Sequence, residues 1–356
     1  MSHSELEGAL LGARRPLASV VVGNFNQASF IEQAIRSVAG QSFRDFECVV
    51  VDDLSTDGSP GRISACLTEL GDARFRFIRR ETNGGQMAAM LAGFDATSAQ
   101  FVAFLDGDDY WSPEFLDRHI AAHLSRAGAA AISTSDMALV DRDGRILAGG
   151  LPNFRNGDPL RAGAPARALR IEGEGHDRLV FIDRRLGGWP WSATSGMVFR
   201  RIAVETMRPP NPEELRICAD GYLARAAHML GGTVRLERAL GFYRLHDGNS
   251  WANSRFFGGG TRSGQAPPGV DKAIRSALLK RFCEVAPRLE SAVERGALRR
   301  ALIAQAGWAG ALELRDSNPG ARLLLEDWAT PRQRLILRLV GLLLPVLRPR
   351  RSGDGR

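Results

Sequence analysis

The chain contains little cysteine. Its 356 residues include four, Cys48, Cys66, Cys218 and Cys283, and their positions give no C-x-x-C spacing. This pattern excludes a disulfide framework and a cysteine-ligated zinc site. We therefore expect four free thiols in a reducing cytoplasm.

Lysine is almost absent, since Lys272 and Lys280 are the only two. The formal net charge is +7, but the segment after Pro331 holds seven arginines and a single acid, Asp354. This segment therefore accounts for six of the seven net charges, and the rest of the chain is close to neutral. A basic nucleic-acid-binding face is not supported by such a distribution, and no nucleic-acid partner is expected.

The sequence also lacks a long hydrophobic run. Its most apolar segment, Leu335 to Leu347, is shorter than the roughly 20 residues of a transmembrane helix. It contains Arg338 and has arginines on both sides. Such a segment suits a helix that lies in a membrane interface and is attracted to anionic lipid. A terminal helix docked on the body is the alternative, and the sequence leaves both open.

The first sixteen residues lack a basic and then apolar signal-peptide pattern, so we expect a cytoplasmic protein. Peripheral contact with the inner face of the cell membrane, through residues 331–356, follows from the first of the two interpretations of the tail.

Short apolar runs alternate with amphipathic helical patterns in the first 130 residues. The pattern predicts strands at residues 17–22, 46–51, 74–78 and 101–105, and helices at residues 28–39, 63–70, 87–96 and 113–127. This alternation is typical of βαβ units. We therefore predict an α/β fold with a mostly parallel central sheet flanked by helices.

The pattern is less regular after residue 130. It predicts two strands joined by Asp143-Gly144 within residues 131–147, a loop at 153–168, a strand ending at 200, a helix at 220–230, a hairpin or strand pair at 233–243, and helices from Lys272 onward. The predicted organisation is an N-terminal tail (1–16), a main domain (17–250) with halves 17–130 and 131–250, a helical extension (251–330) and a basic amphipathic tail (331–356).

The run from Phe101 to Trp111 is the most informative part of the chain. An apolar strand leads directly into Asp106, Asp108 and Asp109. Carboxylates this close together repel one another. A hard divalent cation with oxygen ligands, itself holding a diphosphate, would relieve that repulsion. An acidic surface turn is the alternative.

Three further polar segments follow predicted strands, at residues 23–26, 52–59 and 83–86. Ligands bind at the carboxyl ends of the strands of an open α/β sheet. The four polar segments together therefore favour one binding site over four separate surface loops.

This arrangement resembles glycosyltransferase family 2, whose fold is called GT-A. The matching segments cover about residues 17–250 and read VVVGNFN, VVVDDLSTDGS, NGG, AFLDGDDYWSPEFL, TSGMVFRR, ADGYLARAA and YRLHDGNS. The resemblance implies an inverting glycosyltransferase that uses a nucleotide-activated sugar together with Mn²⁺ or Mg²⁺.

The resemblance also implies a donor site. Phe25 matches a ring that stacks on the nucleotide base, and Asp53 matches a carboxylate that accepts a hydrogen bond from the base, which suits uracil or thymine. A helix cap is the alternative for Asp53, and its neighbour Asp52 is a candidate structural residue. The remaining donor-side candidates are Asn26, Asn83 and Gly84, although a plain turn explains Gly84 and Gly85 equally well.

For the diphosphate, Asp106 and Asp108 match the family's D-x-D pair, in which the first acid is directed toward the ribose and metal and the second binds the metal. Asp109 would orient its neighbours. Arg244 and His246 match a motif beside the diphosphate, where arginine neutralises phosphate and histidine serves as a metal ligand.

Inverting transfer needs a general base that takes the proton of the acceptor hydroxyl. Asp220 is the candidate, because ADGYLARAA aligns with an acidic pair at a helix start in the family, where Ala219 here replaces the first acid. A helix cap is the alternative for Asp220, and Glu213 and Glu214 are the fallback bases.

Four residues that precede a predicted strand are expected on the acceptor side: Trp189, Trp191, Ser195 and Gly196. The combined prediction is transfer from a UDP- or dTDP-sugar to a hydroxyl of a lipid-linked or cell-surface glycan. One rival is a sugar nucleotidyltransferase, which the lack of lysine and arginine in GNFNQAS opposes. Another is an inactive scaffold of a membrane glycan-assembly complex, which the intact acids oppose and Ala219 favours.

Overall fold

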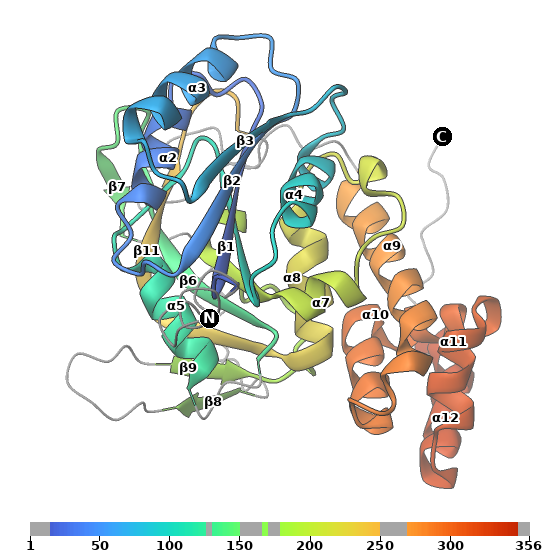
Figure 1. Cartoon of the computed structure of the whole chain (residues 1–356). Coiled ribbons are helices and arrows are strands. Elements are labelled where there is room, and N and C mark those ends of the chain that lie inside the picture. Colours follow the sequence, from blue (N-terminus) through green and yellow to red (C-terminus); the bar gives the residue numbers. More distant parts are fainter. Residues whose placement is uncertain (1–14, 126–129, 150–165, 170–178, 250–268, 348–356) are drawn as a thin grey trace, which may run out of the picture.

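The computed structural model describes residues 15–125, 130–149, 166–169, 179–249 and 269–347. A single sheet forms the centre, and helices cover both of its faces (Figure 1). The strand order along the sheet is β3-β2-β1-β4-β10-β6-β11-β9-β8.

The strands are β1 (Ala18–Asn24), β2 (Phe46–Asp52), β3 (Phe75–Arg79), β4 (Phe101–Asp106), β5 (Tyr110–Trp111), β6 (Ile132–Val140), β7 (Ile146–Ala148), β8 (Ala166–Leu169), β9 (Leu179–Ile182), β10 (Met197–Arg200) and β11 (Thr233–Arg244). The helices are α2 (Ile31–Ala39), α3 (Ser59–Leu70), α4 (Gln86–Asp95), α5 (Phe115–Leu124), α7 (Arg201–Thr206), α8 (Ala219–Gly231), α9 (Val270–Val285), α10 (Arg295–Ser317), α11 (Pro319–Arg322) and α12 (Pro331–Leu347). Short helical turns lie at η1 (Thr194–Gly196), η2 (Pro212–Glu214), η3 (Ala286–Leu289) and η4 (Leu323–Asp327).

The first four long strands, β1 to β4, are parallel, as the alternation of strands and helices predicted. Their side chains alternate between two apolar cores, because successive residues of a strand point to opposite faces. Val20 and Val22 join a core with α2, α3 and α5, whereas Val21 and Val51 join a core with α4 and α8. The mostly parallel α/β architecture is thus confirmed.

The second half of the sheet mixes strand directions. β10 is antiparallel to both β4 and β6, and β11 runs parallel to β6. The two-residue strand β5, which follows the acidic turn, pairs with β11 at Gly241 and Phe242. This pairing places residues 106–109 beside the carboxyl end of β11.

Two expectations for this half differ from the structure. Residues 233–244 form one long strand, β11, instead of a hairpin or strand pair, and its pairing with β6 shifts register around Ala239. Within the expected loop 153–168, residues 166–168 belong to β8, and the remainder lies outside the described residues.

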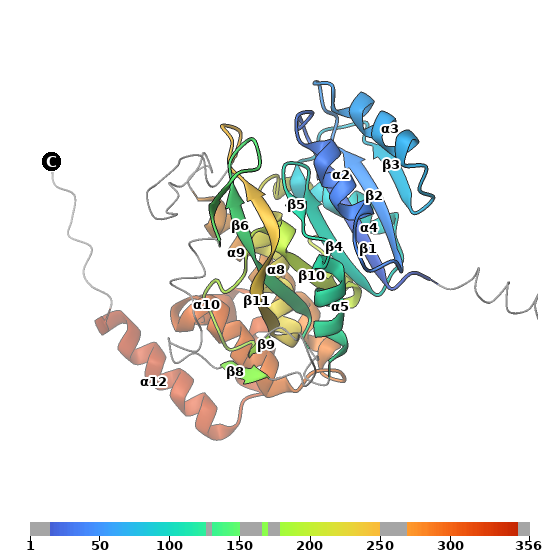
Figure 2. The same ribbon diagram turned by 90° about the vertical axis from the view of Figure 1, so that its left-hand side faces the viewer.

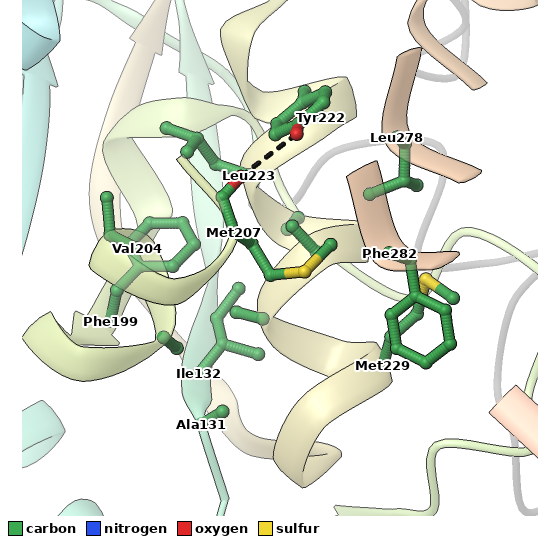
Figure 3. Close-up of a cluster of buried hydrophobic side chains, with 14 of the residues drawn as sticks. Ala131, Ile132, Phe199, Val204, Met207, Tyr222, Leu223, Met229, Leu278 and Phe282 are labelled. Atoms are coloured by element: carbon green, nitrogen blue, oxygen red, sulfur yellow. Dashed lines mark hydrogen bonds between the residues drawn. The ribbon is translucent and has the colours of Figure 1, made fainter. Parts of the chain in front are cut away.

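The helical extension packs on α8 and shares the core of the main domain. Leu278 and Phe282 of α9 lie in the same apolar cluster as Tyr222 and Met229 of α8 (Figure 3). The Tyr222 hydroxyl donates a hydrogen bond to the Met207 carbonyl at 2.9 Å. The helical extension and α8 therefore share one apolar core.

The terminal helix α12 lies at the edge of the molecule (Figures 1 and 2). It contacts α10 and η4, and its Leu337 side chain is buried in the apolar cluster that the helical extension shares with the main domain. None of the helices in the described ranges is long and apolar enough to cross a membrane.

Candidate functional site

A cavity of about 910 Å³, here called the cleft, opens at the carboxyl ends of β1 and β4 and extends to α8 and α9. It is lined by parts of residues 23–27, 83–86, 106–109 and 216–221, together with Asp53. All four polar segments that the sequence singled out therefore contribute to one cleft.

The loops after β1 and β2 are joined by side-chain hydrogen bonds. Asn24 donates from Nδ2 to Asp52 Oδ1 at 2.7 Å and to Ser55 Oγ at 3.1 Å, and the Asn26 N–H donates to the same hydroxyl at 2.9 Å. Asp52 is fully buried and acts structurally here. Between these anchored residues, the Phe25 ring is 46% exposed and lines the cleft, as stacking on a base would require.

Asp53 is buried at the base of the turn before α4. Its carboxylate pairs with Arg80 and accepts from the N–H groups of Gly84 at 3.1 Å and Gly85 at 2.7 Å. Asn83 Nδ2 donates to the Asp53 carbonyl at 2.8 Å. Asp53 therefore shapes the NGG turn and does not cap α3, which begins further along the chain. Contact with a base remains a prediction for this residue, which lines the cleft.

The acidic turn concentrates charge where little water reaches. Burial raises the pKa of Asp106 to about 7, and the charge of Asp108 adds to this rise. Burial likewise raises the pKa of Asp109 well above its usual value, again with a contribution from Asp108. A cation would relieve this cost, and the carboxylate oxygens suit Mg²⁺ or Mn²⁺.

His246 contacts the acidic turn through Asp108. Its Nε2 lies 3.0 Å from Asp108 Oδ2, and its Nδ1 accepts a hydrogen bond from the Gly248 N–H at 3.1 Å. Because Nδ1 accepts, we assign the ring proton to Nε2, which donates to Asp108. In this geometry His246 orients Asp108, and direct metal ligation would require Nε2 to give up that bond.

No group of three histidine, cysteine, aspartate or glutamate side chains suited to a metal ion occurs in the part of the chain that the structure describes. The oxygen donors of Asp106 and Asp108 nevertheless fit a divalent cation in their chemistry. Phosphate oxygens of a bound nucleotide would have to complete the coordination shell.

Arg244 lies behind the acidic turn and is 2% exposed. Its guanidinium donates to the carbonyls of Asp108 at 2.9 Å and Arg142 at 2.7 Å, and to Gln33 Oε1 at 2.6 Å. Its backbone N–H donates to Asp109 Oδ1 at 3.0 Å. The sequence placed Arg244 beside the diphosphate, whereas the structure uses it to brace the turn, and it is not among the residues that line the cleft.

Asp220 lies in the first turn of α8 and lines the cleft. Burial raises the pKa of its carboxyl. Its negative charge contributes to the raised pKa of Asp106, because both carboxyl groups line the cleft. A raised pKa suits a general base that works near neutral pH. The fallback residues Glu213 and Glu214 are exposed and do not line the cleft.

Of the four acceptor-side candidates, Trp189 lines the cleft. Trp191 is fully buried and donates from Nε1 to Thr233 Oγ1 at 2.8 Å, and the buried Ser195 hydroxyl accepts from the Asp106 N–H at 3.1 Å. A side chain at Gly196 would collide with Ser192 Oγ. Trp191, Ser195 and Gly196 thus lie behind the cleft wall, where they support it.

Sequence reasoning missed several residues of this wall. Arg225 of α8 lies over the Trp189 ring at 4.8 Å and donates to the Gly221 carbonyl at 3.0 Å. Asp271 and Ile274 of α9 also line the cleft, so the helical extension contributes to it. Their positions depend on how α9 packs on α8, which no local sequence signal reveals.

The sequence and structure are similar to those of known proteins. Residues 19–150 match the family model "Glycosyl transferase family 2". The chain is 33% identical over 232 residues to "Uncharacterized glycosyltransferase alr2836" of Nostoc sp., covering 65% of this chain and 66% of that protein. It is 29% identical over 235 residues to the succinoglycan biosynthesis protein ExoO of Rhizobium meliloti, covering 66% of this chain and 62% of that protein.

These alignments span just under two thirds of the relatives' own lengths. Among solved structures, S. aureus TarS 1–349 in complex with UDP matches with a TM-score of 0.52 and 18% identity, over 95% of this chain and 94% of that one. That likeness supports the GT-A fold predicted from the sequence. The family match, the relatives and the fold agree that residues 19–150 form a glycosyltransferase family 2 domain.

Proposed function

We propose that this protein transfers a sugar, with inversion, from a UDP- or dTDP-sugar to a hydroxyl group of a glycan, with the help of Mn²⁺ or Mg²⁺. The observation that carries the proposal is the cleft itself. It combines an exposed aromatic ring, a cluster of acids whose charge calls for a cation, and a separate acid with a raised pKa.

The donor end of the cleft would hold the nucleotide. Phe25 offers a ring for the base, and Asp53, Asn26 and Asn83 form the adjoining polar wall. Gly84 does not line the cleft, and its N–H holds the Asp53 carboxylate in place. S. aureus TarS 1–349, which has a similar fold, was solved in complex with UDP. We propose a uridine nucleotide for this chain as well. Arg244 would act indirectly, by holding the acidic turn in place.

Asp106 and Asp108 are the residues that would hold the divalent cation. When bound, the cation would offset the negative charge that develops on the departing nucleoside diphosphate. His246 keeps Asp108 oriented, and Ser195 fixes the backbone at Asp106.

Asp220 would serve as the base. The acceptor oxygen attacks the anomeric carbon as its proton passes to the Asp220 carboxylate. The bond from that carbon to the diphosphate oxygen breaks, and the nucleoside diphosphate leaves with the electron pair. Trp189 and Arg225 border the cleft beyond Asp220, where an acceptor sugar would lie.

We propose a lipid-linked or cell-surface glycan as the acceptor, because one relative is named for succinoglycan biosynthesis. The C-terminal helix is compatible with work at a membrane surface. One side of α12 exposes large apolar side chains at fractions of 40–72%: Leu335, Ile336, Leu339, Leu342 and Leu343. Arg332, Arg334 and Arg338 accompany them, and Leu337 docks on the body. The buried Leu337 fits the docked-helix interpretation, and the membrane contact of the exposed face stays a proposal.

We infer that this face of α12 rests on the anionic inner surface of the cell membrane. The purified protein should sediment with vesicles that contain anionic lipid, and Leu339→Glu with Leu342→Glu should abolish this. Ile202→Glu, at an equally exposed site on α7, is the matched control. Failure of the wild type to bind vesicles would refute the membrane contact. So would a double variant, Leu339→Glu with Leu342→Glu, that binds vesicles normally and differs from the wild type only in its oligomeric state.

The two rival functions make different predictions. A sugar nucleotidyltransferase needs cations for a triphosphate after the first strand, whereas residues 23–29 contain no lysine or arginine. An inactive scaffold would not be stabilised by UDP with Mn²⁺, because it would have lost the site.

The test is a screen of nucleotide sugars for donor hydrolysis and for transfer to glycan acceptors, with the wild type and Asp220→Asn compared. We expect turnover with a UDP- or dTDP-sugar only in the wild type, while both proteins are stabilised by UDP and Mn²⁺. Absence of turnover and of stabilisation across the panel would refute the proposal.

A further inference from the structure

Gln86, the first residue of α4, bridges the two ends of the cleft. Its Nε2 donates to Asp106 Oδ1 at 2.9 Å, and its Oε1 accepts from the Ala219 N–H at 3.0 Å. Its own N–H donates to the Arg216 carbonyl at 2.7 Å. One side chain therefore joins a donor-side carboxylate to the first residue of the helix that carries Asp220.

The chemistry of this bridge suits an amide. The first N–H groups of a helix have no partner within the helix, so Ala219 needs an acceptor from elsewhere. A carboxylate such as Asp106 needs a donor at the same time. A glutamine side chain supplies one of each at its tip without adding charge to the acidic cleft.

The surrounding backbone reinforces the contact. Gly85 has a φ of +84°, and a Cβ there would lie 2.6 Å from Arg216 Cα. Arg216 in turn donates to the Asn83 carbonyl at 3.2 Å and pairs with the Asn83 side chain. Cys218, just before α8, has a φ of 62°, a conformation that persists only where neighbouring contacts fix it. The approach to α8 is thus set by the turn that precedes α4.

We propose that Gln86 is a positioning residue that sets the distance and orientation of Asp220 relative to the diphosphate held near Asp106. This rests on the proposed function, because it assigns a base and a donor to the two ends of the bridge. Gln86 does not itself react. Its loss should impair transfer to an acceptor more than donor binding.

The first experiment compares Gln86→Met with Gln100→Met, at an exposed site just before β4. Gln86→Met keeps the length of the side chain and removes both of its hydrogen bonds. We expect kcat for transfer to fall about tenfold or more in Gln86→Met, because a base that is displaced from its productive position loses much of its effect on the rate. The KM for the donor and stabilisation by UDP with Mn²⁺ should stay within about twofold, a change worth under 0.5 kcal/mol. The control should match the wild type.

A merely structural role would lower transfer, donor hydrolysis and thermal stability in parallel, and this result would overturn the proposal. So would wild-type transfer in Gln86→Met. A wild type that transfers no sugar from any donor would instead refute the proposed function.

Hydrogen–deuterium exchange tests the bridge without any activity. Peptides that span residues 216–222 should exchange faster in Gln86→Met. Gln86→Glu retains an acceptor for the Ala219 N–H, so it should restore much of this protection while transfer stays low. Unchanged exchange in Gln86→Met would show that the bridge does not hold α8.

Discussion

Replacement of Asp106 by asparagine should stabilise the metal-free protein at alkaline pH. The folded protein holds the pKa of Asp106 near 7, against 3.8 for an ordinary aspartate, chiefly because the carboxyl is buried. Each pKa unit corresponds to about 1.4 kcal/mol. Above pH 7, ionised Asp106 therefore lowers the free energy of unfolding by at most about 4 kcal/mol. Asp108 and Asp109 share this cost, and we expect a gain of about 1–4 kcal/mol.

The sign of the pH dependence follows from the fact that the pKa of Asp106 is raised. Between about pH 4 and pH 7, the Asp106 carboxyl is protonated in the folded protein and ionised in the unfolded chain. Its contribution to stability is complete below about pH 4 and is lost as the pH rises through about 7. Asparagine cannot ionise, so the advantage of Asp106→Asn should grow between these two values.

Thermal unfolding in EDTA from pH 4.5 to 8.5 measures this effect. The variant should melt several degrees above the wild type at pH 8.5, at roughly 2–4 °C per kcal/mol, and close to it at pH 4.5. Asp327→Asn, at an exposed position, is the control and should show no such trend. A variant that is less stable at pH 8.5, or equally stabilised at every pH, would show that the buried charge of Asp106 does not destabilise the fold.

Three further predictions concern the cleft and its support. Phe25→Ala should raise the KM for the donor by about 5–100-fold, the loss of one base stack, and an unchanged KM would remove Phe25 from the site. Asp220→Asn should lower kcat by about 10²–10⁴ and abolish the rise of rate with pH through the raised pKa of Asp220, without change in UDP binding; full turnover would exclude Asp220 as the base. Gly196→Ala should destabilise the fold by about 1–3 kcal/mol through its collision with Ser192, whereas Gly61→Ala, with open space around it, should be neutral or stabilising in urea titrations.

Much of the parallel half could be predicted from the sequence, because strand and helix signals there are local. The runs that became β1, β2 and β4 are apolar, and each is followed by polar residues that line the cleft. Their convergence follows from the parallel sheet alone. The strand β11 was harder to predict, because the pattern of residues 233–243 was interpreted as a hairpin or strand pair, whereas the structure has one continuous strand with register shifts around Ala239.

The roles of single residues in the site depend on packing that the sequence does not display. A single residue separates Trp189 from Trp191, yet the first lines the cleft and the second is fully buried. Arg244 belongs to a recognisable motif, but its direction is set by Gln33 and Arg142, which are distant in the sequence. Gln86 was visible only as part of a turn, because its partners lie 20 and 133 residues away.

Titration calorimetry of UDP, in Mn²⁺ and in EDTA, with wild type and Asp108→Ala compared, is the decisive experiment for the proposed donor site. We predict that Mn²⁺ strengthens binding of UDP to the wild type and has little effect on the variant. Equal affinity in all four conditions, or no binding in any, would contradict a cleft in which acidic side chains and a divalent cation together hold a nucleoside diphosphate.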